Sequence, residues 1–388
     1  MDNTTFDFIV IGAGIAGASI AAHLAQRGRV LLLEGEEQPG YHTTGRSAAL
    51  FSTIYGNAPV RALSRASRDF LFQPPPGFSD VPLVHPRPTL FFARPEQLEL
   101  LHEARADEDV RSATRLLDAA QAWQLLPVFR PGYLGGGMIE DASADIDVHA
   151  LHQGYLRSAR RLGAELVTGR PVQSLARDGN AWHVHVADSQ FQAPIVVNAA
   201  GAWGDVVACA AGVAPVGLRP LRRTAMVIDA PDGMRPNDWP AAIAADESFY
   251  FRPEAGRLLL SPADETPSEP CDAQPDEWDV AVAVDHFERA VGTPVARVLR
   301  RWAGLRVFTD DRTPVAGFAP DAPGFFWFVG QGGYGIQTAE GLARAGAAAA
   351  CNEALPQSLV EHGVSLDDIS PARTSLRPAA SPSNSSNS

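Results

Sequence analysis

FIVIGAGIAG, residues 8–17, predicts the architecture of this chain more strongly than any other stretch of its sequence. The apolar residues 8–11 are typical of a buried strand, and a helix-compatible apolar stretch follows at residues 18–25. Between them lie three glycines with the spacing GxGxxG, namely Gly12, Gly14 and Gly17. A strand before this motif and a helix after it are the context of a dinucleotide-binding fingerprint.

A second apolar run, residues 30–33, ends at Glu34, at the distance where the fingerprint places its acid. The glycines permit a tight turn, a close approach of backbone to a pyrophosphate, and close packing of helix on strand. The helix N-terminus offers unpaired N–H groups to phosphates. Glu34 can bind a ribose diol. A glycine-rich strand–helix unit without a ligand is the alternative, and the full context favours a dinucleotide.

Composition excludes several function classes. The net charge of −13 argues against a nucleic-acid partner. All 32 cationic residues are arginine, which excludes a pyridoxal Schiff base, a P-loop lysine and a catalytic ammonium. Cys209, Cys271 and Cys351 are far apart, so we expect neither a metal site nor disulfides, and a cytoplasmic location. The uncharged stretch 8–22 is too short for a transmembrane segment.

Nucleotide-binding character recurs at the other end of the chain. The apolar run 325–329 precedes the glycine-rich turn 330–337 and an alanine-rich helix, an arrangement more typical of flavin than of nicotinamide enzymes. We therefore expect an α/β fold, in which a Rossmann-like FAD-binding domain is interleaved with a β-rich α+β substrate domain. The predicted boundaries are 1–80, 146–214 and 304–369 for the FAD-binding domain, 81–145 and 215–303 for the substrate domain, and 370–388 for a disordered tail.

Seven motifs together resemble the D-amino acid oxidase, glycine oxidase and sarcosine oxidase superfamily of FAD enzymes. They are IGAGIAGAS (11–19), QPGYHTTGRSAA (38–49), DIDVHALHQGYLR (145–157), VVNAAGAWGD (196–205), DESFY (246–250), WAGLR (302–306) and QGGYGIQT (331–338). The resemblance covers residues 5–370. Within the superfamily, the chain is most similar to the D-arginine dehydrogenases.

The resemblance implies FAD as the cofactor, with its ADP on the glycine loop, its adenine edge at Val172, and Thr43 to Leu50 beneath the flavin ring. We expect FAD to be non-covalent, because the 330–337 turn has no cysteine and His42 is expected to face solvent. The residues assigned to FAD are Gly12, Gly14, Ala16, Gly17, Glu34, Gly35, Thr43, Thr44, Gly45, Arg46, Ser47, Ala48, Ala49, Val172, Gly332, Tyr334, Gly335 and Ile336.

The resemblance also implies a substrate site. Arg306 and Tyr250 would bind an α-carboxylate, which suits the bidentate geometry of arginine, with Arg223 nearby. The Gly333 carbonyl and Gln337 would meet the α-amino group, and Tyr55 would belong to a mobile loop over the pocket. The alternatives are a surface ion pair for Arg306, core packing for Tyr250 and Tyr55, and Arg222 as the inward arginine in place of Arg223.

Two positions depart from the D-arginine dehydrogenases. Leu50 stands where a histidine is expected, and Thr89 where a glutamate would hold a substrate guanidinium. Together with Phe51 they imply a more apolar pocket, and Asp246 and Glu247 are expected to point away from it. We therefore predict a preference for neutral or apolar side chains, since burying an unpaired cation is costly.

The predicted activity is a D-amino acid dehydrogenase. Hydride would pass from the substrate Cα to flavin N5, and water would convert the imino acid to a 2-oxo acid and ammonia. The N-terminus of the last helix would stabilise charge on the flavin. No general base is evident, and the electron acceptor is unidentified. The alternatives are a 2-hydroxy-acid or secondary-amine oxidase on the same fold, and a non-catalytic flavin-binding protein.

Overall fold

Strand β1 (Phe8–Ile11) lies inside a six-stranded sheet of the computed structural model, which describes residues 4–376. The strand order is β20-β21-β13-β1-β2-β9, and all neighbours are parallel except β20 and β21. The other members are β2 (Val30–Leu33), β9 (Glu165–Val167), β13 (Ile195–Asn198), β20 (Val315–Phe318) and β21 (Phe325–Val329).

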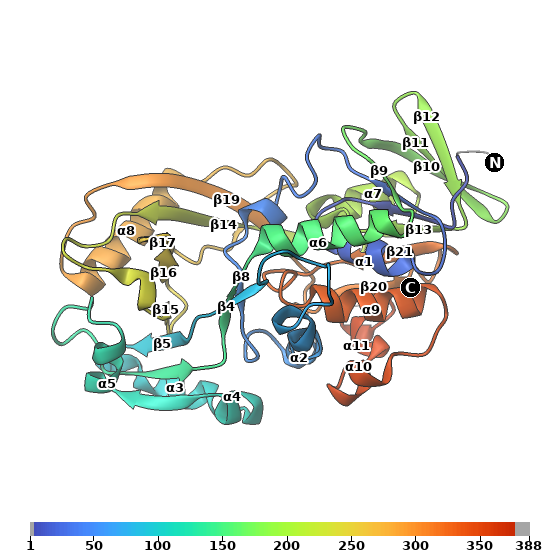
Figure 1. Cartoon of the computed structure of the whole chain (residues 1–388). Helices are drawn as coiled ribbons and strands as arrows, with labels where there is room; N and C mark the ends of the chain where they lie inside the picture. Colours follow the sequence, from blue (N-terminus) through green and yellow to red (C-terminus); the bar gives the residue numbers. More distant parts are fainter. Residues whose placement is uncertain (1–3, 377–388) are drawn as a thin grey trace, which may run out of the picture.

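Both faces of this sheet are covered, which explains why its strands read as continuous apolar runs. Phe8 and Val10 share one core with the helices α1 (Ile15–Leu24), α6 (Val148–Arg161) and α9 (Ala339–Ala350). Ile9 and Ile11 face a second core, formed with α7 (Gly204–Ala210) and with a three-stranded sheet of β10 (Val172–Asp178), β11 (Ala181–Val186) and β12 (Ser189–Ala193). Figure 1 shows α1, α6 and α9 in the lobe that contains both chain ends.

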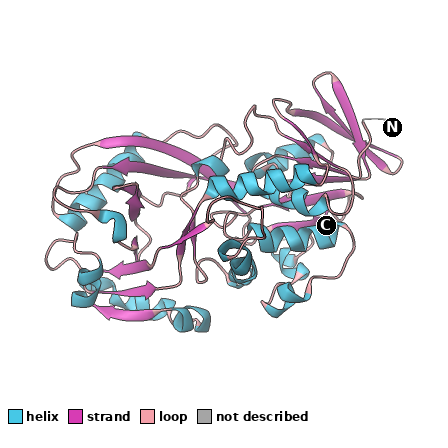
Figure 2. Ribbon diagram, in the orientation of Figure 1, coloured by secondary structure: helices cyan, strands magenta, loops and turns pink. Residues whose placement is uncertain are grey.

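The other lobe is built on a nine-stranded sheet, mostly antiparallel (Figure 2). Its order is β18-β14-β17-β16-β15-β5-β7-β6, and β19 also pairs with β14. The strands are β5 (Thr89–Ala93), β6 (Arg115–Asp118), β7 (Gly136–Glu140), β14 (Arg219–Ile228), β15 (Ala241–Ala244), β16 (Tyr250–Glu254), β17 (Arg257–Ser261), β18 (Thr266–Pro267) and β19 (Val298–Phe308).

Helix α8 (Glu277–Val291) supplies buried residues to the core of this lobe, and the shorter α3 (Leu98–Ala104), α4 (Glu108–Ala113) and α5 (Ala119–Leu125) pack near β5 to β7. A small sheet of β3 (Leu50–Phe51), β8 (Ala144–Ile146) and β4 (Val84–Pro86) lies between the lobes. The remaining helices are α2 (Ala58–Phe72), α10 (Gln357–Glu361) and α11 (Leu366–Ile369), with short 3-10 turns at Thr44–Arg46, Pro95–Gln97, Gly201–Trp203, Pro236–Asp238 and Thr374–Leu376.

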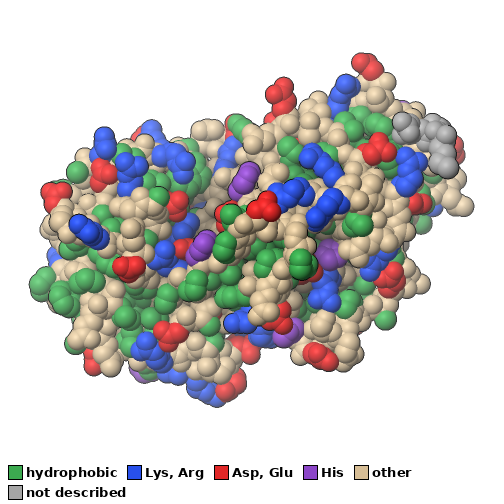
Figure 3. Space-filling view, viewed as in Figure 1, with side chains coloured by type: hydrophobic (Ala, Val, Ile, Leu, Met, Phe, Trp, Pro, Cys, Tyr) green, Lys and Arg blue, Asp and Glu red, His purple; other side chains and the backbone are tan. Residues whose placement is uncertain are grey.

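The predicted fold class is confirmed, including the two kinds of sheet. Asp147 caps α6 as predicted, because its side chain accepts a hydrogen bond of 2.8 Å from Ala150 N. The domain boundaries stay a proposal. The predicted tail begins too early, since Arg373 forms an ion pair with Asp311, while residues 377–388 lie outside the described part of the chain. On the face in Figure 3, acidic and arginine side chains are intermixed.

Candidate active site

A cavity of about 1120 Å³ lies between the two large sheets. One wall comes from the ends of β1, β2 and β13, and the opposite wall from β5, β14, β15 and β19 and from Tyr250 at the start of β16. Typical small-molecule pockets measure about 300–1,000 Å³, so this cavity can hold a large cofactor together with a substrate.

The glycine loop forms a cradle that side chains would fill. Gly12 has φ of +97°, and a Cβ there would lie 2.6 Å from Ala199 O. A Cβ on Gly17 would lie 1.7 Å from Gly12 O. Ile11 pairs in parallel with Leu33 and Asn198, so the loops after all three strands leave the sheet at one edge. The N-terminus of α1, whose first-turn N–H groups lack intrahelical partners, opens at this edge.

Two polar side chains organise the rest of the cradle. Thr44 Oγ1 accepts a hydrogen bond of 2.9 Å from Ile15 N and so joins the second loop to α1. Glu34 accepts hydrogen bonds from Ala13 N (2.8 Å) and Glu36 N (3.0 Å), which orient its carboxylate on the cavity wall. Backbone cradle, helix N-terminus and oriented acid fit the ADP half of FAD. No ligand geometry is needed for this conclusion.

All of the predicted cofactor residues line the cavity except Gly17 and Gly45. Gly17 serves the packing of α1 on β1. Gly45 packs against Gly40, whose oxygen accepts a hydrogen bond of 2.7 Å from Gly45 N. The guanidinium of Arg46 is occupied elsewhere, since it donates to Ala273 O and Ala303 O and pairs with Asp272. The cofactor loops thus contain residues that pack or link the chain as well as residues on the cavity wall, and the assignment of these residues to FAD stays a prediction.

The second wall carries arginine and tyrosine side chains. Arg306 Nη1 donates to Tyr55 Oη at 3.2 Å. The backbone of Gly333 lies against the guanidinium, because a Cβ at this position would lie 3.0 Å from Arg306 Cζ. Within residues 4–376, Arg306 has no carboxylate at ion-pair distance. Arg306 is therefore a cavity cation whose charge no acid of the described chain neutralises directly.

Arg223 lies on the same face of the sheet as Arg306. The register pairs Leu221 with Arg306 and Arg223 with Gly304 across β14 and β19, and successive residues of a strand alternate between faces. Arg223 donates to Asp264 O at 2.7 Å and pairs with Glu265 at 3.2 Å. Arg222 faces away and pairs with Asp279 at 2.9 Å. The inward arginine is thus Arg223, as predicted.

The pKa shifts indicate a positive potential in this part of the cavity. Burial lowers the pKa of Arg223, and the charge of Arg306 lowers it further. Burial by itself would raise the pKa of Tyr250, but Arg306 and Arg223 outweigh burial and lower it. A tyrosine whose anionic form is favoured in this way marks a place where an anion is stabilised.

Gln337 lines the cavity and is 2% exposed. Its Oε1 accepts from Ser52 N at 3.1 Å, and its Nε2 donates to Ser52 O (3.2 Å) and Ser64 Oγ (2.7 Å). These bonds join the residue after β3, helix α2 and the glycine turn. Since an amide oxygen can accept two hydrogen bonds, the role of Gln337 toward a substrate amine stays a prediction. The Gly333 backbone also lies on the cavity wall.

Beyond the arginines, the cavity extends into an apolar lobe between β5, β7 and α3. Leu50 and Thr89 line the cavity as predicted, and Thr89 Oγ1 accepts from Ser143 Oγ at 2.9 Å. Phe51 was expected there but is fully buried against Phe72. The apolar lobe is completed by Ile54, Phe91, Leu100, Leu101, Val110, Met138, Ile243 and Phe249.

Two acids next to this lobe differ in position. Asp246 accepts from Gln97 and lies within 3.7 Å of Arg94, outside the cavity lining. Glu247 does line the cavity, contrary to our expectation, and it is exposed, with a φ of +56°. An exposed acid interacts weakly with a cation because water screens it.

Several cavity residues were not predicted. Glu265, Asp311 and Arg312 line the cavity near Arg306, and His42 lies on its wall between Tyr41 and Trp203 rather than facing solvent. No sequence motif identifies Glu265, Asp311 and Arg312, because Glu265 is far in sequence from the two residues that it joins at the cavity. In the described residues no cluster of His, Cys, Asp or Glu could hold a metal ion. None of the helices between residues 4 and 376 is long and apolar enough to cross a membrane.

Known proteins share this fold and its sequence pattern. Residues 7–349 match the family model DAO, described as FAD dependent oxidoreductase. The chain is 23% identical over 350 residues to an uncharacterized oxidoreductase, YurR of Bacillus subtilis (strain 168), covering 85% of this chain and 90% of YurR.

Two solved structures share the fold at low identity. Glycine oxidase from Geobacillus kaustophilus has a TM-score of 0.79 at 20% identity, over 91% of this chain and 96% of that one. L-alpha-glycerophosphate oxidase from Mycoplasma pneumoniae, with FAD bound, has a TM-score of 0.81 at 17% identity, over 90% and 96%. The closer similarity to D-arginine dehydrogenases remains a prediction. The chain belongs to the DAO family of FAD-dependent oxidoreductases, and FAD is its cofactor.

Proposed function

We propose that the protein is an FAD-dependent dehydrogenase of D-amino acids that produces a 2-oxo acid and ammonia. The observation that carries this proposal is Arg306, a cavity cation that has no acid partner among residues 4–376 and lies next to Tyr250 and Arg223. A guanidinium in this position suits a substrate carboxylate, which it can bind through two parallel hydrogen bonds. An α-carboxylate is common to every substrate of the proposed class.

The residues of the chain bind and orient the substrate. Arg306 takes the carboxylate, Tyr250 adds one directional hydrogen bond, and the Gly333 carbonyl is the acceptor for the α-amino group. When bound, FAD supplies the two-electron acceptor for oxidation at the substrate Cα. No side chain is assigned as a general base. The amine therefore binds in its neutral form or gives its proton to water.

The apolar lobe supports a preference for neutral and apolar side chains. Leu50, Phe91 and Met138 offer contacts to a leucine, methionine or phenylalanine side chain. A guanidinium would have to leave water without a buried carboxylate at Thr89, a loss of about 2–5 kcal/mol by analogy with truncated charge pairs. The exposed Glu247 would return about 0–1 kcal/mol. The balance favours the neutral substrates.

Anaerobic mixing tests the proposal. The holoenzyme is mixed with D-leucine, D-methionine, D-phenylalanine, D-arginine, their L-enantiomers, 2-hydroxy acids and N-methyl amino acids, and the flavin absorbance is followed. We expect rapid bleaching with apolar D-amino acids and ammonia as a product. Faster bleaching by 2-hydroxy acids or N-methyl amino acids would instead identify a 2-hydroxy-acid or secondary-amine oxidase that binds the substrate carboxylate through Arg306 and Tyr250. Bleaching by none of these compounds would refute the proposed function.

A further inference from the structure

The turn between β19 and β20 connects the two lobes close to the carboxylate-binding residues. Strand β19 carries Arg306 and belongs to the nine-stranded sheet, whereas β20 belongs to the six-stranded sheet. Asp311 and Arg312 of this turn line the cavity. The conformation of the turn therefore affects the charges around the substrate site.

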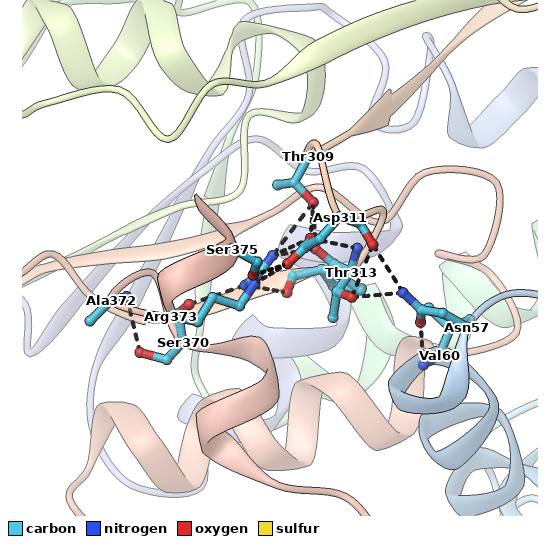
Figure 4. A network of polar contacts seen from close by, with 10 residues as sticks. Asn57, Val60, Thr309, Asp311, Thr313, Ser370, Ala372, Arg373 and Ser375 are labelled. Atoms are coloured by element: carbon cyan, nitrogen blue, oxygen red, sulfur yellow. Dashed lines mark hydrogen bonds and ion pairs between the residues drawn. The ribbon is translucent and has the colours of Figure 1, made fainter. Parts of the chain in front are cut away.

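A C-terminal residue holds this turn, as Figure 4 shows. Arg373 Nε donates to Asp311 Oδ2 at 2.7 Å, and Nη2 donates to Oδ1 at 2.9 Å. The same guanidinium donates to Thr313 O at 2.7 Å and to Pro314 O at 3.2 Å. The Arg373 side chain is only 8% exposed. One planar fork thus joins the residues of the turn from the side of the C-terminal segment.

A second contact holds the turn from the opposite side. Asn57 Nδ2 donates to Asp311 O (3.1 Å) and Thr313 Oγ1 (2.8 Å), while its Oδ1 caps α2. Between these two anchors, Arg312 adopts φ of +58°, which is unfavourable for a residue with a side chain. The anchors are what keep Arg312 in this conformation.

The left-handed conformation places the Arg312 guanidinium on Glu265. Its two terminal nitrogens donate to Glu265 Oε1 (2.6 Å) and Oε2 (3.0 Å), and it lies 3.9 Å from the centre of the Phe308 ring. Glu265 also accepts from Arg223 at 3.2 Å. Arg312 and Arg223 therefore share one carboxylate, so Glu265 compensates the charge of Arg223 less completely and repels an incoming carboxylate less.

We propose that Arg373 is a positioning residue for substrate binding. It locks the 309–314 turn, the turn holds Arg312 on Glu265, and the net positive charge that Arg223, Arg306 and Arg312 leave around Glu265 attracts the substrate carboxylate. The proposal rests on the proposed function only for the identity of the substrate. Binding of a carboxylate that is not turned over tests it separately.

The experiment titrates the holoenzyme with benzoate, a carboxylate with an apolar body, and reads the dissociation constant from the flavin absorbance. The variants are R373A, R312A, R373A/R312A and R373K. We expect each alanine variant to weaken benzoate binding about tenfold, and the double variant to bind no more weakly than R312A. R373K should give an intermediate value, because an ammonium cannot replace the planar fork. FAD content should match that of the parent, whereas R373A should melt at a lower temperature because it loses the ion pair with Asp311.

Arg344 provides the matched control, because its guanidinium donates to the Ser358 hydroxyl on the surface, away from the 309–314 turn. R344A should bind benzoate like the parent. Binding by R373A within twofold of the parent, or a double variant weakened by the product of the single effects, would overturn the proposal. If R373A fails to fold, the same criterion applies to R373K, and benzoate binding by R373K within twofold of the parent would overturn the proposal. A parent that binds benzoate but oxidises no amino acid refutes only the proposed function, whereas a parent that binds no benzoate refutes both.

Discussion

At the residue scale, the site depends on which charges are compensated. Arg306 and Arg223 lie on one face of neighbouring strands, and each is treated differently by its surroundings. Arg223 has Glu265 as a partner, while the guanidinium of Arg306 contacts the Tyr55 hydroxyl and no carboxylate of the described residues. We expect Arg306 to bind the substrate carboxylate, because no acid of the described residues pairs with it.

Replacing Arg306 by alanine tests this assignment. R306A should lose about 2–5 kcal/mol of transition-state binding, or roughly 30- to 4,000-fold in kcat/KM, because a charge-assisted pair is removed from a desolvated site. FAD should stay bound. R222A is the matched control, because that arginine lies on the other face and pairs with Asp279. An unchanged kcat/KM for R306A would remove the residue from the site.

The presence of Thr89 and Leu50 on the cavity wall predicts a preference for substrates with neutral or apolar side chains. The parent should have a higher kcat/KM for D-leucine than for D-arginine, and T89E should raise the value for D-arginine and lower it for D-leucine, since a buried carboxylate pairs with a guanidinium. E247Q should change D-arginine turnover little, because Glu247 is exposed. If D-arginine is preferred by more than about tenfold, which is roughly 1.4 kcal/mol, the argument fails. A large loss of that activity in E247Q would then identify Glu247 as the acid.

At the scale of elements, the turn after β19 is held by ionised Asp311. Burial by itself would raise the pKa of Asp311, but hydrogen bonds from Arg373, Ser375 and Thr313 outweigh it and hold the pKa well below the ordinary 3.8. A carboxyl whose pKa is lower in the folded state contributes stability above the unfolded pKa and loses it as the pH falls.

The unfolding free energies of the parent and D311N should therefore differ most at neutral pH. The difference should shrink as the pH falls below 3.8, because the unfolded parent then binds a proton at Asp311 that the folded parent binds only at a still lower pH. D310N is the control, because the neighbouring Asp310 is exposed and pairs only with the exposed Arg219. Denaturant titrations at several pH values measure this. A difference that does not depend on pH would show that the charge of Asp311 is not what holds the turn.

At the scale of the whole molecule, we expect FAD to occupy the cavity between the lobes without a covalent bond, because the 330–337 turn contains no cysteine. His42 is the alternative residue for covalent attachment of FAD, because it lies on the cavity wall. Acid precipitation should release the yellow colour into the supernatant, because a non-covalent cofactor loses its site when the fold is lost. Colour that stays in the pellet would contradict the prediction, and H42A would then test His42 as the attachment residue.

The absence of lysine from the chain also bears on whether the reduced flavin passes its electrons to oxygen or to another acceptor. In sarcosine-oxidase relatives a lysine near the flavin promotes the reaction with oxygen, so we expect a dehydrogenase. With a D-amino acid substrate, reduction of an artificial dye should be much faster than production of hydrogen peroxide in air. Peroxide formation that keeps pace with dye reduction would instead identify an oxidase.

Local sequence determined the nucleotide-binding half of this protein. The apolar strands, the glycine spacing, Glu34 and the cap at Asp147 depend on contacts between near neighbours or on a periodicity that a short stretch displays. Their positions follow from parallel pairing, which brings the ends of β1, β2 and β13 to one edge. The resemblance to known enzymes added Arg306, Tyr250 and Arg223, and the structure brings these three to one cavity.

Only the tertiary structure decided how the charges of the site are balanced. The use of Gln337 by Ser52 and Ser64, the pairing of Arg312 with Glu265, and the hold of Arg373 on Asp311 all join residues from distant parts of the chain. The residue types in these pairs are ordinary surface types in sequence. Whether an arginine pairs with an acid of the chain or remains available to a substrate depends on guanidinium–carboxylate distances of a few ångströms. These distances are set only when the two sheets pack around one cavity.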